Sequence, residues 1–177
     1  MIEGVRFGRV ERHADERGSF RELWRESWFA GQRFAQANAS VSAPGVLRGL
    51  HLHRHQMDHW VVTRGRGFVA LVDIRPVLAG GGTPVVETRE MAVDDWCVIP
   101  AGVAHGFLAL EELEMLYLVT AEYDGSDEFS FAWDDADAAV PWPPVPPTDD
   151  GRPILSERDL TNPSLRELVA SLAGLST

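Results

Sequence analysis

Six short runs rich in β-branched and aromatic residues, divided by turn signals, most constrain how this chain of 177 residues can fold. Short strands at a spacing of about ten residues favour an antiparallel sandwich or barrel over alternating β and α units. The segment Gln36–Ser42 alternates in polarity and predicts one more strand. We therefore predict an all-β fold. The six runs are His59–Thr63, Gly67–Ile74, Val85–Val93, Trp96–Ile99, Gly106–Leu110 and Met115–Thr120.

The two ends of the chain depart from this pattern. Asp15–Gly18 has the composition of a turn between short apolar pieces, and it predicts an N-terminal strand extension. Pro141–Pro147 contains five prolines, so we expect an extended strap over the sheet and neither helix nor interior strand. A short C-terminal helix should begin at Pro163, because one apolar stripe follows it at helical spacing. The stripe consists of Leu165, Leu168, Val169, Leu172 and Leu175.

The composition limits the function classes. With 45% hydrophobic and 24% charged residues, the chain can bury a core, and its length predicts a single domain over residues 1–177. A net charge of −11 argues against non-specific binding to nucleic acid, and no apolar run approaches the ~20 residues of a membrane helix. The single cysteine, Cys97, and the lack of a signal-like segment lead us to expect a cytoplasmic protein. All 16 basic residues are arginine, which excludes lysine chemistry such as a Schiff base.

Four of the six histidines lie within nine residues of one another. If this segment is a strand, His51, His53 and His55 share one face, because side chains alternate along a strand, and His59 follows closely. For a single histidine, a polar rim at the end of a strand is the simpler interpretation. Three at alternate positions, followed by a carboxylate, favour a site inside a barrel.

The spacing around these histidines resembles the two metal-binding motifs of cupins. Gly45 to Gly65 fits the first motif, with Asp58 where glutamate is usual, and Pro100 to His105 fits the second. This resemblance implies a cupin, or jelly-roll, barrel. It also implies that one divalent metal ion could be held by imidazole and carboxylate ligands. The ligands would be His51, His53, Asp58 and His105.

A closer resemblance extends over nearly the whole chain. Its elements appear in one order, and as a set they resemble the dTDP-4-dehydrorhamnose 3,5-epimerase family. Members of this family are metal-free cupin homodimers that act on nucleotide-linked 4-keto-6-deoxyhexoses in deoxysugar biosynthesis. The elements are Asp15-x-Arg17-Gly18-x-x-x-Glu22, Gln36-x-Asn38-x-Ser40-x-Ser42, Pro44–His51, Val72–Arg75, Ile99–Phe107, Tyr117 with Tyr123, Trp142-Pro143 and Leu155-Ser156-x-Arg158-Asp159.

This resemblance implies a role for each matching residue. His51 matches the base that removes the proton beside the ketone, and Asp159 matches the carboxylate that pairs with this base. Tyr117 matches the acid that returns a proton on the opposite face of the sugar, and Tyr123 matches the ring that packs against the nucleotide. Other substrate-binding positions are Arg17, Glu22, Gln36, Asn38, Arg48, His105, Glu128 and Arg158.

One position departs from the family. Asp58 aligns with the lysine that steadies the enolate oxygen, and a carboxylate beside a developing oxyanion raises the barrier. Three hypotheses follow. We favour a cofactor-free epimerase in which His53, His59 or an arginine replaces the lysine. The second is a metal-dependent enzyme that uses Asp58 as a ligand, and the third is a non-catalytic binder of sugar nucleotides.

Overall fold

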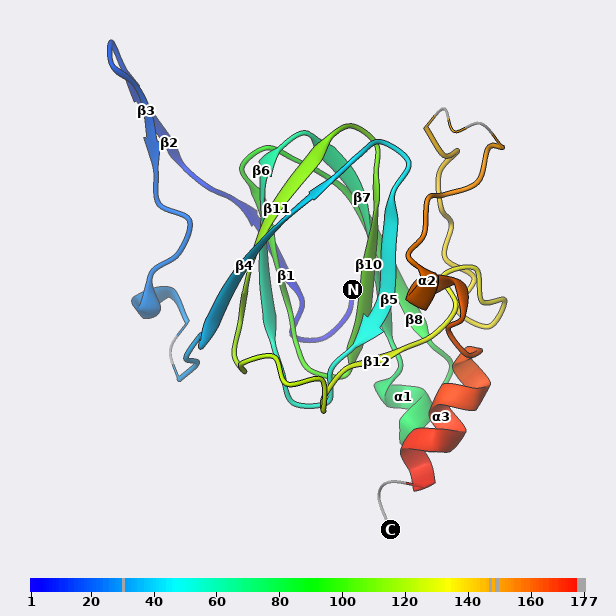
Figure 1. The fold of residues 1–177 in the computed structure, drawn as a ribbon. Coiled ribbons are helices and arrows are strands. Elements are labelled where there is room, and N and C mark those ends of the chain that lie inside the picture. Colours follow the sequence, from blue (N-terminus) through cyan, green and yellow to red (C-terminus); the bar gives the residue numbers. More distant parts are fainter. Residues whose placement is uncertain (30, 147, 149, 175–177) are drawn as a thin grey trace.

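Two five-stranded antiparallel sheets face each other and form a barrel in the computed structural model, which describes residues 1–29, 31–146, 148 and 150–174 (Figure 1). The first sheet has the order β1 (Arg6–Arg9), β9 (Asp95–Ile99), β6 (Asp58–Arg64), β11 (Leu113–Val119) and β4 (Gln36–Ser42). The second has the order β12 (Phe129–Ser130), β5 (Leu47–Leu52), β10 (Val103–Ala109), β7 (Arg66–Asp73) and β8 (Val85–Ala92). The predicted all-β cupin-type barrel is confirmed.

Strand β7 shows how the sequence builds both layers of the core. Its side chains alternate between the two faces of the second sheet. Val69 and Leu71 belong to the cluster inside the barrel, whereas Ala70 and Val72 belong to a second cluster on the outer face. All four are buried, which explains why β7 reads as a continuous apolar run and not as an alternating one.

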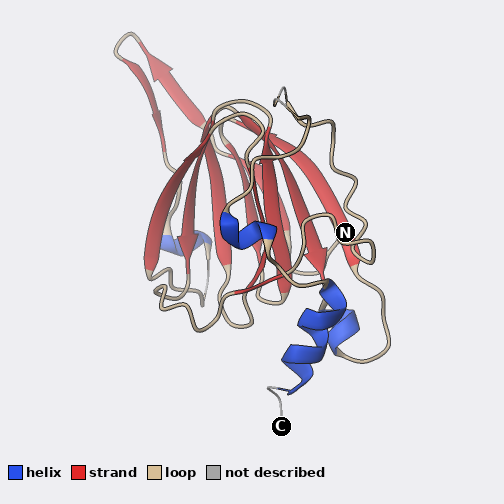
Figure 2. Cartoon of the chain, turned by 45° about the vertical axis from the view of Figure 1, so that its right-hand side comes forward, coloured by secondary structure: helices blue, strands red, loops and turns tan. Residues whose placement is uncertain are grey.

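The C-terminal part of the chain covers the outer face of the second sheet (Figure 2). Helix α3 (Leu165–Gly174) buries Leu165, Leu168 and Leu172 there, which confirms the predicted stripe, while Leu175 lies outside the described residues. Residues 141–146 form neither helix nor strand, as predicted, and Trp142 packs against Phe68; Pro147 is not described. The short helices are η1 (Glu26–Trp28), α1 (Arg75–Leu78) and α2 (Glu157–Leu160).

The N-terminal extension is a hairpin that projects away from the barrel (Figures 1 and 2). Strands β2 (Arg12–Asp15) and β3 (Gly18–Arg21) pair with each other only, among the described strands, and are largely exposed. The buried Asp94, in the turn between β8 and β9, holds the base of the hairpin. Its carboxylate accepts a hydrogen bond from Nε of Arg12 at 2.9 Å and another from Arg21. None of the described helices has the length and apolar character to cross a membrane.

Candidate active site

A cavity of about 370 Å³ lies between the two sheets and gathers most of the predicted site residues. Asp159 stands behind His51 and contacts it directly. Arg17 and Glu22 are not among the described residues of the cavity wall: Arg17 pairs with Asp15 in the hairpin, and Glu22 pairs with Arg25. The predicted residues on the wall are Gln36, Asn38, Arg48, His51, His105, Tyr117, Tyr123, Glu128 and Arg158.

Two glycines allow the histidine-bearing strands to approach each other. Gly49 in β5 has φ +127°, and a Cβ there would lie 2.6 Å from Cα of Gly106 in β10. The register of the two strands shifts at this point, and His51 is paired with His105. Because a side chain at either glycine would separate the backbones, Gly49 and Gly106 allow the pairing of β5 and β10 that places His51 opposite His105.

His51 is oriented by a carboxylate that is itself fixed in place. Its Nε2 lies 3.0 Å from Oδ1 of Asp159, while Oγ of Ser156 donates to Oδ2 of Asp159 at 2.9 Å. Ser156 also caps α2 by accepting from the backbone N–H of Asp159. Burial opposes ionisation of Asp159, but the hydrogen bonds from His51 and Ser156 outweigh it and hold the pKa of this carboxyl below its usual value. An ionised Asp159 accepts the proton on Nε2, which leaves Nδ1 of His51 as the basic atom.

Tyr117 faces the cavity from the other sheet. It lies on β11 in the first sheet, whereas His51 lies on β5 in the second, and both line the cavity wall. Burial raises the pKa of the Tyr117 phenol, so that the hydroxyl keeps its proton at neutral pH. The cavity therefore has a proton acceptor on one wall and a proton donor on the other.

The mouth of the cavity carries a polar network. Nε2 of Gln36 donates to Oδ1 of Asn38 at 2.8 Å, and Oε1 of Gln36 accepts from the backbone N–H of Tyr123 at 2.9 Å. Arg158 pairs with Glu128 at 2.9 Å. A guanidinium group can donate two parallel hydrogen bonds to two phosphate oxygens, so Arg158 at this wall suits an anionic substrate.

Asp58 lies at the start of β6, buried in the cavity wall with 4% of its surface exposed. Its Oδ1 accepts from Nε2 of Gln56 at 2.8 Å, and its Oδ2 accepts from Nε1 of Trp60 at 3.1 Å. Nε2 of His105 lies 3.8 Å from the same Oδ2. Burial lowers the pKa of His105 to about 4, so this ring is neutral at pH 7.

The predicted shared face of His51, His53 and His55 is wrong, because β5 ends at Leu52. The carboxylate of Asp127 accepts from the backbone N–H groups of residues 54, 55 and 56 at 2.8, 2.9 and 3.1 Å, and this turns the chain out of the sheet. His53 still lines the cavity, whereas His55 is exposed. Asp127 was not predicted as a site residue, since nothing in the local sequence connects it to a loop some 70 residues earlier.

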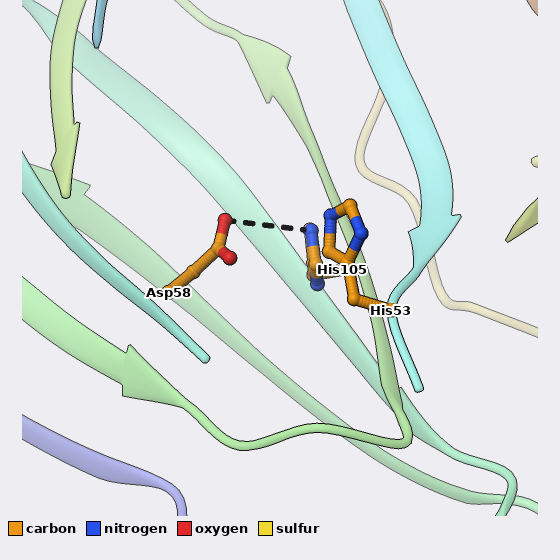
Figure 3. Close-up of side chains that lie close together, drawn as sticks. All are labelled: His53, Asp58 and His105. Atoms are coloured by element: carbon orange, nitrogen blue, oxygen red, sulfur yellow. Dashed lines mark ion pairs between the residues drawn. The ribbon is translucent and has the colours of Figure 1, made fainter. Parts of the chain in front are cut away.

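Two further expectations need correction. The alternative metal set of four residues is reduced to three, because among the described residues His53, Asp58 and His105 bring their ligand atoms within 4.8 Å of one another and His51 is not in this group (Figure 3). His59 cannot replace the family's lysine, since it follows Asp58 along β6 and points to the opposite face. It lines a separate cavity beside Phe29 and Trp96.

Comparisons with known proteins agree with this geometry. The profile of the family described as dTDP-4-dehydrorhamnose 3,5-epimerase matches residues 1–167. The chain belongs to the dTDP-4-dehydrorhamnose 3,5-epimerase family. A family member from Methanothermobacter thermautotrophicus, named dTDP-4-dehydrorhamnose 3,5-epimerase, is 37% identical over 94% of this chain and 92% of its own length.

Two solved structures of similar proteins contain a dTDP-sugar. The Legionella pneumophila epimerase, in complex with dTDP-4-keto-L-rhamnose, has a TM-score of 0.83 and 30% identity over 97% of this chain and 93% of its own. The 3'-monoepimerase ChmJ from Streptomyces bikiniensis, in complex with dTDP-quinovose, has a TM-score of 0.82 and 31% identity over 98% and 89%. This chain contains no lysine, and Asp58 stands where the sequence resemblance led us to expect one.

Proposed function

We propose that this protein is an epimerase of a dTDP-linked 4-keto-6-deoxyhexose in deoxysugar biosynthesis. The observation that carries the proposal is the pairing of His51 with Asp159 at the wall of a cavity whose opposite wall presents Tyr117. Membership of the epimerase family and the dTDP-sugars bound to its relatives support the same substrate class.

In this proposal, His51 takes the proton from the carbon beside the ketone. The electron pair of the broken C–H bond moves toward the ketone oxygen, and Asp159 stabilises the imidazolium that forms. Tyr117 then returns a proton to the same carbon from the opposite wall. Removal from one face and return to the other inverts the configuration, which is the chemical result of an epimerase. The two proton transfers are made by the side chains of His51 and Tyr117.

We further propose that the active unit is a homodimer. Arg17, at the tip of the projecting hairpin, and Glu22, just beyond β3, match substrate-binding positions of the family but lie away from the cavity of their own chain. Phe20, on the same hairpin, is 62% exposed, and Trp28 is 47% exposed. A second copy would cover these apolar side chains and receive Arg17 at its own cavity. The cytoplasmic location expected from the sequence stays a prediction.

The experiment that tests the activity is solvent-deuterium incorporation. The protein is incubated in D₂O with dTDP-4-keto-6-deoxyglucose and related 4-keto sugars, and the mass of the nucleotide sugar is measured by mass spectrometry. Each epimerised carbon should acquire one deuterium, so the mass gain also separates a 3-epimerase from a 3,5-epimerase. His51→Asn should abolish the gain. A parent protein that binds the nucleotide sugars and incorporates no deuterium would support the non-catalytic binder instead.

A further inference from the structure

Three side chains with metal-binding atoms converge in the cavity wall, from three separate parts of the chain (Figure 3). His53 follows the end of β5, Asp58 begins β6, and His105 lies in β10. One possible ligand atom from each lies within 4.8 Å of the other two. Nε2 of His105 is 3.8 Å from Oδ2 of Asp58, a separation that a shared cation would shorten by less than about 1 Å.

The hydrogen bonds of the two histidines fix which ring nitrogen is free. Nδ1 of His53 lies 2.7 Å from the carbonyl oxygen of Asp127, and Nδ1 of His105 lies 3.1 Å from the carbonyl oxygen of Val103. A carbonyl oxygen only accepts, so Nδ1 is the donor in both rings. In a neutral imidazole, Nε2 then carries the lone pair. A backbone carbonyl on the far nitrogen is the arrangement that orients histidine ligands of metals.

The carboxylate of Asp58 is oriented in the same way. Gln56 donates to one oxygen and Trp60 to the other, and both donors are neutral. The negative charge of a buried carboxylate is therefore only partly compensated by its described partners. Two imidazole lone pairs and a carboxylate that face one another repel, unless a cation lies between them.

We propose that His53, Asp58 and His105 bind one divalent first-row transition-metal ion, with its open positions toward the cavity beside His51. Two imidazoles and one carboxylate suit iron(II), manganese, cobalt, nickel or zinc, and three protein ligands leave room for further ligands. His51 is not part of this group, since the ligand atoms found within 4.8 Å of one another among the described residues belong to His53, Asp58 and His105. The binding site itself does not depend on the epimerase activity.

The catalytic role of the ion does rest on the proposed function. The resemblance aligns Asp58 with a lysine that would steady the enolate oxygen. A cation held by Asp58 would restore positive charge at that place, where it offsets the charge that develops on the ketone oxygen as His51 takes the proton. The aspartate would then be a means of keeping the cation in place and no longer an obstacle to the reaction.

Metal binding is tested with the full chain, after the purification tag has been removed and the protein dialysed against a chelator. Co²⁺ is titrated and its visible absorption is followed, and Zn²⁺ is added in competition. We expect one equivalent per chain. Removal of a residue that only hydrogen-bonds to a metal ligand typically weakens metal affinity by about 10–100-fold. Removal of a ligand itself should cost more, so Asp58→Asn and His53→Gln should each weaken binding by more than about 100-fold. His55→Gln, an exposed histidine of the same loop, is the matched control and should bind as the parent does.

His51→Asn separates the three-ligand site from the four-ligand set suggested by the sequence, and it should leave Co²⁺ binding intact. Thermal unfolding of each variant shows whether a loss of binding is a loss of fold. No stoichiometric Co²⁺ or Zn²⁺ in the parent, or equal binding in folded Asp58→Asn, would overturn the site. Deuterium exchange measured in the same samples distinguishes failure of the metal-site proposal from failure of the epimerase proposal. Binding without exchange refutes the epimerase alone, and exchange that is equal with and without metal refutes the catalytic role of the ion.

Discussion

Nε2 of His51 lies 3.0 Å from Oδ1 of Asp159, although 108 residues separate the two in the chain. The contact joins β5 of the second sheet to α2 in the C-terminal part of the chain. Asp159 is held by Ser156 at its other oxygen, so the carboxylate is in place before any substrate arrives. This preorganisation allows His51 to become an imidazolium at little cost in reorganisation.

Asp159→Asn should therefore reduce proton exchange at the carbon beside the ketone by about 10²-fold or more, because the imidazolium loses its counter-charge. The exchange rate in D₂O measures this. Ser156→Ala is the graded comparison. It removes one hydrogen bond and the cap of α2, so it should cost about 1 kcal/mol of stability and only a modest part of the rate. Equal rates in Asp159→Asn and the parent would remove Asp159 from the mechanism.

Tyr117→Phe should separate the two halves of the reaction. The variant keeps His51, so the substrate should still exchange its proton with solvent, but the phenol that returns a proton from the opposite wall is absent. We expect the ratio of epimerised product to exchanged substrate to fall at least about tenfold. Nuclear magnetic resonance of the sugar gives the product, and mass spectrometry gives the exchange. If both fall by the same factor, Tyr117 does not act in the second step alone.

The sequence predicts a strand from more than one kind of pattern. β6 and β7, which are mostly buried, were predicted to within one residue at each end because their apolar runs are long, whereas β4 was predicted from its alternating polarity. β5 was not delimited, because Arg48 and Gly49 interrupt its apolar pattern. Gly49 is required by the close approach of β5 to β10, which is visible only in the fold. α1 and α2 have four residues each, too few for a helical period to be visible.

Site residues that belong to a family motif could be predicted from the sequence. Site residues whose role depends on contacts made in the fold could not. His51, Tyr117 and Asp159 follow from the resemblance to the family. Gln56, Trp60 and Asp127 do not. Gln56 and Trp60 act by donating to Asp58. Asp127 acts on the loop after β5, some 70 residues away in the chain. The distinction between three and four converging ligands also depends on the fold, because only the structure shows that His51 lies outside the described group of His53, Asp58 and His105.

Gly49→Ala should destabilise the fold far more than a similar change at Gly18. The two glycines have nearly the same backbone angle, φ +127° and φ +131°, but a Cβ at Gly18 meets nothing within 4 Å, whereas one at Gly49 lies 2.6 Å from Cα of Gly106. Backbone strain alone costs about 1–3 kcal/mol, so Gly18→Ala should lose no more than that. Gly49→Ala should lose more than about 4 kcal/mol in urea unfolding, because a strand must move. Equal losses would mean that the approach of β5 to β10 is not needed.

Two inactive variants should restore activity when mixed, if Arg17 completes the site of a neighbouring chain. His51→Asn removes the base, and Arg17→Ala removes the contact from the hairpin. In a mixed dimer, one site carries both defects and the other carries neither. Random re-association of equal amounts should recover about a quarter of the parent activity. Light scattering should give twice the 19.6 kDa of one chain for the parent and for both variants. A monomer at micromolar concentration, or no recovery on mixing, would contradict the shared site.

Asp58→Lys tests how the missing lysine is replaced. An ammonium at this position removes a ligand and repels a cation from His53 and His105, so Co²⁺ binding should be lost. The same ammonium supplies the positive charge that the resemblance places beside the ketone. Any proton exchange that remains in Asp58→Lys should therefore not respond to chelator. Proton exchange by the parent should fall on chelation and return with added metal. Asp58→Asn is the control, because it removes the ligand without supplying a charge and should lose both metal and exchange. If chelator leaves the parent unaffected and Asp58→Lys exchanges faster than the parent, the cation is not used and Asp58 is a handicap of this protein.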